Sequence, residues 1–145
     1  MPSVLRQAGY RTEMVVSLDS DLAGLKEFLE YNGIERYYAE QDFPQQAERL
    51  GLGLTDGALL EFIEHRVTAI QAEATPFFLA ALTTSTHHPF AVPTNHPDVQ
   101  ALTKHSDGYV AALRYLDAEL ERVFSRMRAR GLRDNTIVLI LGDHG

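Results

Sequence analysis

Two short apolar runs of the sequence each end in residues that could do chemistry. The run FFLAALT at 77–83 leads into the loop TSTHHPF, which contains His87 and His88. The run TIVLIL at 136–141 leads into Gly-Asp-His-Gly. In an open α/β sheet, ligands bind beyond the carboxyl ends of the strands. If both runs are parallel central strands, we expect the histidine loop and the Asp-His pair to lie close together.

Asp143 and His144 could bind a divalent metal ion. Neighbouring side chains alternate on a strand, but in a tight loop between Gly142 and Gly145 both can turn toward one ion. A carboxylate oxygen with an imidazole nitrogen suits Mn²⁺, Zn²⁺ or iron better than Ca²⁺, which prefers oxygen ligands. The pair therefore favours Mn²⁺ or Zn²⁺, with Ca²⁺ or Mg²⁺ as alternatives. The other interpretation is that Asp143 caps a following helix and His144 is merely polar.

His87 or His88, in STHHPF, could donate a hydrogen bond to a substrate oxyanion or leaving group. The alternative is a solvated loop histidine without a function. His96 and His105 have no comparable placement and are expected at the surface, and the acidic run DAELE at 117–121 is expected on the solvated face of a helix. The chain has no cysteine, which excludes a thiolate nucleophile and a cysteine zinc site.

Length and charge limit the possible partners. The chain has 145 residues, the size of one domain, and a formal net charge of −7. An acidic chain disfavours nucleic acid, whose phosphates bind to basic faces, but allows a small anionic substrate held through a metal ion. No apolar run reaches the ~18 residues of a membrane span, and the N-terminus lacks the features of a signal peptide. We therefore expect either a cytoplasmic chain or a targeting segment that lies upstream.

The elements that must position these residues follow from apolar periodicity, caps and breakers. Helices and strands alternate, which predicts an α/β layered fold with a mostly parallel sheet. The expected elements in chain order are helix 3–8, strand 13–17, a helix from Asp21, an irregular segment 34–53, helix 55–72, strand 77–83, an irregular loop 84–98, helix 99–129 and a fully buried strand 136–141.

With these residues in view, the sequence resembles the sulfatase family of the alkaline phosphatase superfamily, including its lipoteichoic acid synthase-like phosphoglycerol transferases. The resemblance spans nearly the whole chain, and its most specific part is the last. Four stretches produce it in the order of the family: PSVLRQAGYRT, LGLTDGALLEFIEH, PFFLAALTTSTHHPF, and the long segment YVAALRY to GDHG.

The resemblance implies an α/β/α sandwich and transfer of a sulfuryl or phosphoryl group from a small anionic ester or lipid head group. It implies that Asp143 and His144 are the metal pair of the Asp-His-Gly motif and that His87 contacts the sulfate or phosphate. The family's nucleophile and first acidic metal ligand lie upstream of this region. Residues 1–145 would then be a single partial catalytic domain, without the N-terminal segment that contains the catalytic nucleophile and without the C-terminal part. Such a fragment is expected to be inactive by itself.

Several alternatives stay open on sequence grounds. Sulfate and phosphate esters are both possible, and no arginine stands at 22–25, where the transferase branch usually has one. Relatives work outside the cytoplasm, often tethered to a membrane, so the same is expected of the whole protein. The rival interpretation is a non-catalytic α/β module that binds a partner through the 84–98 loop, with Gly-Asp-His-Gly as an ordinary loop.

Overall fold

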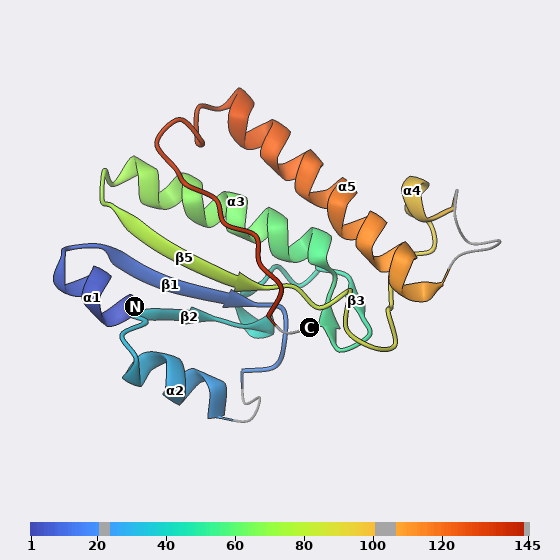
Figure 1. Cartoon of the computed structure of the whole chain (residues 1–145), viewed down its shortest axis with the longest axis horizontal. Coiled ribbons are helices and arrows are strands. Elements are labelled where there is room, and N and C mark those ends of the chain that lie inside the picture. Colours follow the sequence, from blue (N-terminus) through green and yellow to red (C-terminus); the bar gives the residue numbers. More distant parts are fainter. Residues whose placement is uncertain (21–23, 101–106, 144–145) are drawn as a thin grey trace.

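A parallel sheet lies between two layers of helices in the computed structural model, which describes residues 1–20, 24–100 and 107–143 (Figure 1). The sheet has three strands in the order β2-β1-β5, and β1 pairs in parallel with both neighbours. The predicted α/β fold with a parallel sheet is therefore confirmed. The strands are β1 (Arg11–Val16), β2 (Arg36–Tyr38) and β5 (Phe77–Leu82).

The helices cover both faces of this sheet. In Figure 1, α1 and α2 lie on one side of the strands, and α3 and α5 lie on the other. A two-stranded antiparallel hairpin, β3–β4, precedes α3. The bounds are α1 (Pro2–Gln7), α2 (Leu25–Tyr31), the 3₁₀ turn η2 (Glu40–Asp42), β3 (Arg49–Leu50), β4 (Gly53–Leu54), α3 (Asp56–Ala72), α4 (Pro97–Gln100) and α5 (Gly108–Ala129).

Strand β1 separates two parts of the core because its side chains alternate between faces. Val15 packs with Leu59 on the α3 side. Val16 packs with Leu18 and Ala39 on the opposite side, together with part of α2. All of these residues are buried.

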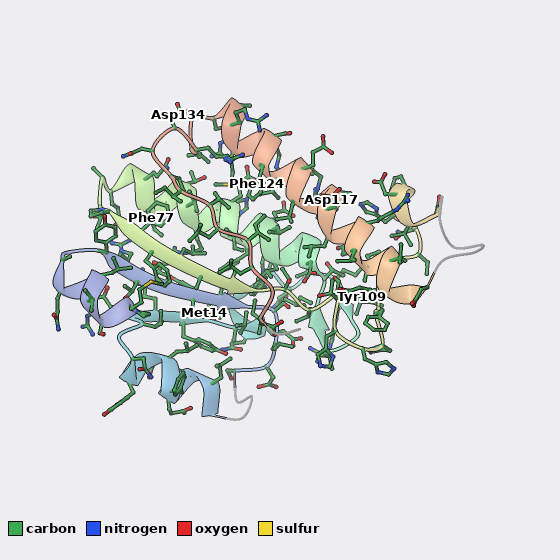
Figure 2. All side chains as sticks on the ribbon, in the orientation of Figure 1. Met14, Phe77, Tyr109, Asp117, Phe124 and Asp134 are labelled. Atoms are coloured by element: carbon green, nitrogen blue, oxygen red, sulfur yellow. The ribbon has the colours of Figure 1, made fainter. Side chains whose placement is uncertain are left out.

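Helices α3 and α5 form the third part of the core. Leu60 and Val67 of α3 pack against Val123 and Met127 of α5, and Phe77 of β5 lies against the same cluster. Figure 2 labels Phe77 on β5 and Phe124 on α5, the two aromatic side chains that border this cluster. The predicted helix 55–72 is confirmed as α3, whose N-cap Thr55 accepts a hydrogen bond from the Ala58 N–H. A helix begins where such a side chain satisfies a free backbone donor.

The predicted buried strand at 136–141 is wrong for the structure described. These residues pair with no strand of the described sheet, and Ile137, Leu139 and Leu141 are 89%, 77% and 82% exposed. A central parallel strand needs a partner strand on each side and helices over both faces. Past β5, the described residues provide no further strand and no helix layer that would cover this segment. For the same reason β5, a continuous apolar run in the sequence, is only half-buried.

Other boundaries differ from the sequence expectation in smaller ways. The segment 34–53 contains β2, η2, β3 and β4, which are too short to give a periodic signal. Residue Asp21 lies outside the described residues, and α2 buries no side chain, with Phe28 63% exposed. The expected helix 99–129 appears as α4 and α5, with 101–106 outside the description. No helix in the described parts of the chain is long and apolar enough to cross a membrane.

A buried ion pair joins β1 to α3. The Glu13 carboxylate is fully buried and accepts hydrogen bonds from Arg66 Nη2 at 2.8 Å and Arg66 Nε at 3.0 Å. The Arg66 guanidinium also lies 4.8 Å from the Tyr38 ring centroid. A charge in mid-strand is tolerated here because the fork of the guanidinium matches both carboxylate oxygens.

A second buried carboxylate joins α3 to α5. Glu64 Oε2 accepts a hydrogen bond from Arg126 Nε at 2.8 Å, and Glu64 Oε1 accepts one from Arg130 Nη1 at 3.0 Å. Burial opposes ionisation of Glu64, but the hydrogen bonds from the two arginines outweigh burial and hold the pKa of Glu64 below its ordinary value. The charged form is therefore part of the folded state.

Replacing Glu13 with alanine should lower the free energy of unfolding by about 3 kcal/mol, because the partly buried Arg66 is left without its partner. Urea unfolding measures the change. Glu61→Ala, on the exposed face of α3, is the matched control and should change stability by less than about 0.5 kcal/mol. Equal effects of the two substitutions would contradict the assigned role of the ion pair.

The stability of the fold should decrease in acid because of Glu64. Since its folded-state pKa is lowered, the stabilisation is present above the ordinary pKa of 4.5 and is lost as the pH falls below that value. Glu64→Gln should weaken the fold at neutral pH and give a shallower loss of stability below pH 4.5. Urea midpoints measured across this pH range test the expectation, which fails if wild type and variant lose stability with the same slope.

Candidate functional site

The carboxyl ends of β1, β2 and β5 meet at one edge of the sheet, where the strand arrowheads of Figure 1 lie. Two backbone hydrogen bonds tie neighbouring segments to this edge. The Glu40 N–H donates to the Leu18 oxygen at 2.9 Å, and the Leu54 N–H donates to the Ser17 oxygen at 2.8 Å. A Cβ atom at Gly53 would lie 2.0 Å from the Ser17 oxygen, so only glycine allows the β3–β4 hairpin to approach so closely.

His87 follows β5 in a tight turn at this edge. Its N–H donates to the Thr84 oxygen at 3.0 Å, and its own carbonyl accepts from the Phe90 N–H at 2.8 Å. The imidazole is exposed, with Nδ1 2.7 Å from the His88 carbonyl oxygen. Because a carbonyl oxygen only accepts, Nδ1 holds a proton, and Nε2 is the nitrogen left for a ligand.

His88 is placed differently from its neighbour. Its ring meets the Phe90 ring edge-on at 5.8 Å between centroids, and Phe90 in turn meets Tyr109 of α5 at 5.6 Å. Tyr109 is labelled in Figure 2 at the end of α5 that borders this loop. The φ angle of Phe90 is +61°, a left-handed conformation that is uncommon for a bulky residue. His88 therefore belongs to an aromatic cluster that shapes the loop.

The carboxylate of Asp56 supports the beginning of the same loop. Asp56 is the first residue of α3 and is fully buried. Its Oδ1 accepts the Thr84 N–H at 2.8 Å, and its Oδ2 accepts the Ser85 N–H at 3.1 Å. The helix N-terminus favours the negative charge. The sequence analysis did not single out Asp56, although the Thr-Asp pair at a helix start is a recognisable capping signal.

His96 and Glu119 support the far end of the loop, and their expected surface positions are wrong. The His96 side chain is only 17% exposed, with Nε2 3.2 Å from Glu119 Oε1 and its ring edge-on to Tyr115. Glu119, from the acidic run expected to be solvated, is buried and also binds Arg122. An α-helix turns one residue in three or four inward, and composition alone does not reveal which acidic residue that is.

Two clefts open near this edge. The smaller, of about 10 Å³, lies between the β3–β4 hairpin and the loop and is bordered by Gly51, Ser85 and His87. That volume holds about one water molecule. The larger, of about 480 Å³, is open to solvent and is bordered by Asp19, Arg49 and residues around η2.

The Asp-His pair is described only in part. Asp143 is exposed at the end of the described residues, and His144 lies outside them. In the projection of Figure 1, the segment 136–143 crosses α3 and β5 toward the arrowhead side of the sheet. No group of three or more His, Asp or Glu side chains that could hold a metal ion occurs within the described ranges. The predicted convergence of His87 with Asp143 and His144 therefore stays a prediction.

Charged side chains of both signs border the larger cleft at this edge. Asp19 and Glu40 border the larger cleft, and Arg49, which also borders it, is paired with Glu40. Arg49 partly offsets the negative charge of these two carboxylates.

The sequence matches known proteins along almost the whole chain. Lipoteichoic acid synthase from Staphylococcus saprophyticus is 26% identical over 99% of this chain, and lipoteichoic acid synthase 1 from Bacillus subtilis is 24% identical over the same share. The chain spans 23% of the length of each of these relatives.

Solved structures share the fold. The lipoteichoic acid synthase LtaP from Listeria monocytogenes gives a TM-score of 0.79 at 20% identity, covering 92% of this chain and 34% of that one. A protein of the alkaline phosphatase superfamily from Vibrio parahaemolyticus gives 0.78 at 20% identity, covering 88% and 31%. The Streptococcus pyogenes phosphoglycerol transferase GacH, solved with sn-glycerol-1-phosphate, gives 0.54 at 15% identity, covering 83% and 33%.

The sequence profile of the family described as Sulfatase matches residues 1–145, the entire chain. Together with the alkaline phosphatase-like arrangement of its parallel sheet, this match places the protein in the sulfatase family.

Proposed function

We propose that residues 1–145 form one part of a catalytic domain that transfers a phosphoryl or sulfuryl group from a small anionic ester or lipid head group. The observation that supports this most is the placement of His87. It stands beyond the carboxyl end of a parallel strand, on a loop anchored at both ends, with Nε2 free of the hydrogen bond that Nδ1 makes. Of the two reactions, phosphoglycerol transfer is favoured, because the curated relatives are named lipoteichoic acid synthases.

In this proposal His87 binds the group that is transferred. With Nδ1 bonded to a carbonyl, the neutral ring offers Nε2 as an acceptor and the protonated ring offers it as a donor. A donor aimed at a phosphate or sulfate oxygen stabilises the charge that builds there in the transition state. The exposed position leaves the imidazole accessible to an ester that approaches from solvent.

Asp143 and His144 would hold the divalent metal ion. Their donor atoms fit Mn²⁺ or Zn²⁺ best, with Ca²⁺ or Mg²⁺ as alternatives. A bound cation would neutralise the transferred group and activate a hydroxyl nucleophile. The nucleophile and further ligands are proposed to lie in other parts of a longer protein, so the 145-residue chain alone should be inactive.

The segment 136–141 would reach this site as a further parallel strand on the open edge of β5. Its six residues are apolar or β-branched and are mostly exposed, and an extended apolar segment gains stability by pairing and burial. Pairing in the direction of β5 would bring the Asp-His pair to the edge that holds His87. That the whole protein acts outside the cytoplasm, anchored to a membrane, stays a prediction.

The rival function is a non-catalytic module that binds a partner through the 84–98 loop. The buried anchors of the loop are compatible with both functions. The end-to-end match to the sulfatase family favours the enzyme. The two substitutions below separate the alternatives.

Asp143→Ala should weaken binding of Mn²⁺ to the chain by at least about tenfold, since a charged ligand is removed. Isothermal titration calorimetry measures the affinity. Asp117→Ala is the matched control, because Asp117, labelled on α5 in Figure 2, is exposed and far in sequence from the proposed pair. The metal role of Asp143 is wrong if both variants and the wild type bind Mn²⁺ equally.

In a catalytically complete protein that contains this chain, His87→Ala should lower kcat/KM for a phosphoglycerol ester by about 10²- to 10⁴-fold, the range for a group that donates or accepts a proton in the transition state. His88→Ala is the neighbouring control and should have a much smaller effect, since its ring packs on Phe90. Full activity of the His87 variant would contradict the proposed substrate contact.

A further inference from the structure

We propose that Asp56 is a positioning residue, whose buried carboxylate sets the path of the loop that places His87 at the edge of the sheet. The inference rests on the proposed substrate contact of His87, but the contacts that support it are independent of any ligand. Asp56 lies on a different element from His87 and does not border either cleft at this edge.

The carboxylate of Asp56 acts on backbone groups. Each oxygen accepts one N–H from consecutive residues, Thr84 at 2.8 Å and Ser85 at 3.1 Å. The side chain forms no ion pair among the described residues, and the residue is fully buried. A buried charge without a cationic partner is costly unless it is fully hydrogen-bonded, so the two N–H groups and the helix N-terminus are what stabilise it.

From these two N–H groups a short series of hydrogen bonds leads to His87. The carbonyl of Thr84 accepts the His87 N–H at 3.0 Å, and the His87 carbonyl accepts the Phe90 N–H at 2.8 Å. The Thr84 hydroxyl also lies 3.3 Å from the hydroxyl of Ser17, at the end of β1. Through its contacts, Thr84 therefore connects the turn that holds His87 to both α3 and β1.

The first turn of α3 also connects to the far end of the loop. The Gly57 N–H donates to the Tyr115 hydroxyl at 2.9 Å, and a Cβ atom at Gly57 would lie 3.0 Å from Glu119 Oε2. Glu119 in turn contacts His96 at 3.2 Å. Two adjacent residues of one helical turn thus support both ends of the loop, one by direct contact and one through α5.

A purely structural role for Asp56 is the competing interpretation, in which the carboxylate only stabilises α3 and the fold as a whole. The two roles predict that loss of the Asp56 carboxylate loosens different parts of the structure. Loss of a positioning contact should loosen the loop and leave β1 unchanged, whereas loss of a general stabilising contact should loosen all elements together.

Amide hydrogen exchange measured by NMR on the 145-residue chain tests this difference. In the wild type, the N–H groups of Thr84 and Ser85 should exchange at least about tenfold more slowly than those of Thr94 and Asn95, which lie in the exposed part of the loop. Exchange at equal rates would overturn the proposal, and this arm requires no variant.

Asp56→Asn has the size of the native residue but loses one acceptor, because its NH₂ group faces a backbone N–H. We expect exchange at Thr84, Ser85 and His87 to accelerate by about tenfold or more, since a charge-assisted hydrogen bond is lost, with Val16 of β1 unchanged within about threefold. Asp117→Asn is the matched control on exposed α5 and should change none of them. No acceleration in the loop, or the same acceleration in β1, would overturn the proposal.

Titration with inorganic phosphate in the presence of Mg²⁺, the diamagnetic alternative ion, followed through the His87 ring resonances, separates this inference from the proposed function. The wild type and Asp117→Asn should respond, and Asp56→Asn should respond at least about fivefold more weakly, because its loop samples other positions. If the wild type does not respond, the substrate contact of His87 is wrong while the exchange data still decide the role of Asp56. Equal responses of wild type and Asp56→Asn would overturn the positioning role.

Discussion

The parallel pairing of β1 with both of its neighbours is the constraint on which the remaining structure depends. Parallel strands cannot be joined by a tight turn, so β1 is followed by α2 before β2, and α3 precedes β5. All three strands consequently end at one edge. The helices that make these crossovers bury the two faces of β1, and the same crossover that builds the core places the start of α3 beside the end of β5.

The buried carboxylates of this fold are stabilised by hydrogen bonds to protein groups rather than by contact with solvent. Glu13 and Glu64 are each paired with arginines, whereas Asp56 is held by backbone N–H groups. An arginine partner joins two elements through long side chains, and a backbone partner fixes the path of the chain itself. This difference explains why the first two residues belong to the core and the third belongs to the support of the functional loop.

Periodicity predicted the elements whose signal lies within one continuous stretch of sequence. Helix α3, the parallel strand β5 and the α/β layering follow from spacing, caps and continuous apolar runs. The same reasoning failed at 136–141, because apolar content shows that a segment can be buried but not which element covers it. It also missed Asp56, His96 and Glu119, whose roles arise from contacts between residues 23 to 29 positions apart. Motif resemblance identified His87, Asp143 and His144 as site residues. It could do so only because each belongs to a short motif whose residues are adjacent in sequence.

The exposed run at 136–141 has a consequence for the aggregation of the chain at high concentration. Six consecutive residues without charge, proline or glycine, rich in isoleucine, valine and leucine, meet the compositional conditions for cross-β stacking. Concentrated samples of the 145-residue chain would thus favour fibrillar assembly seeded at this segment, and an added lysine or proline there would act as a gatekeeper against it.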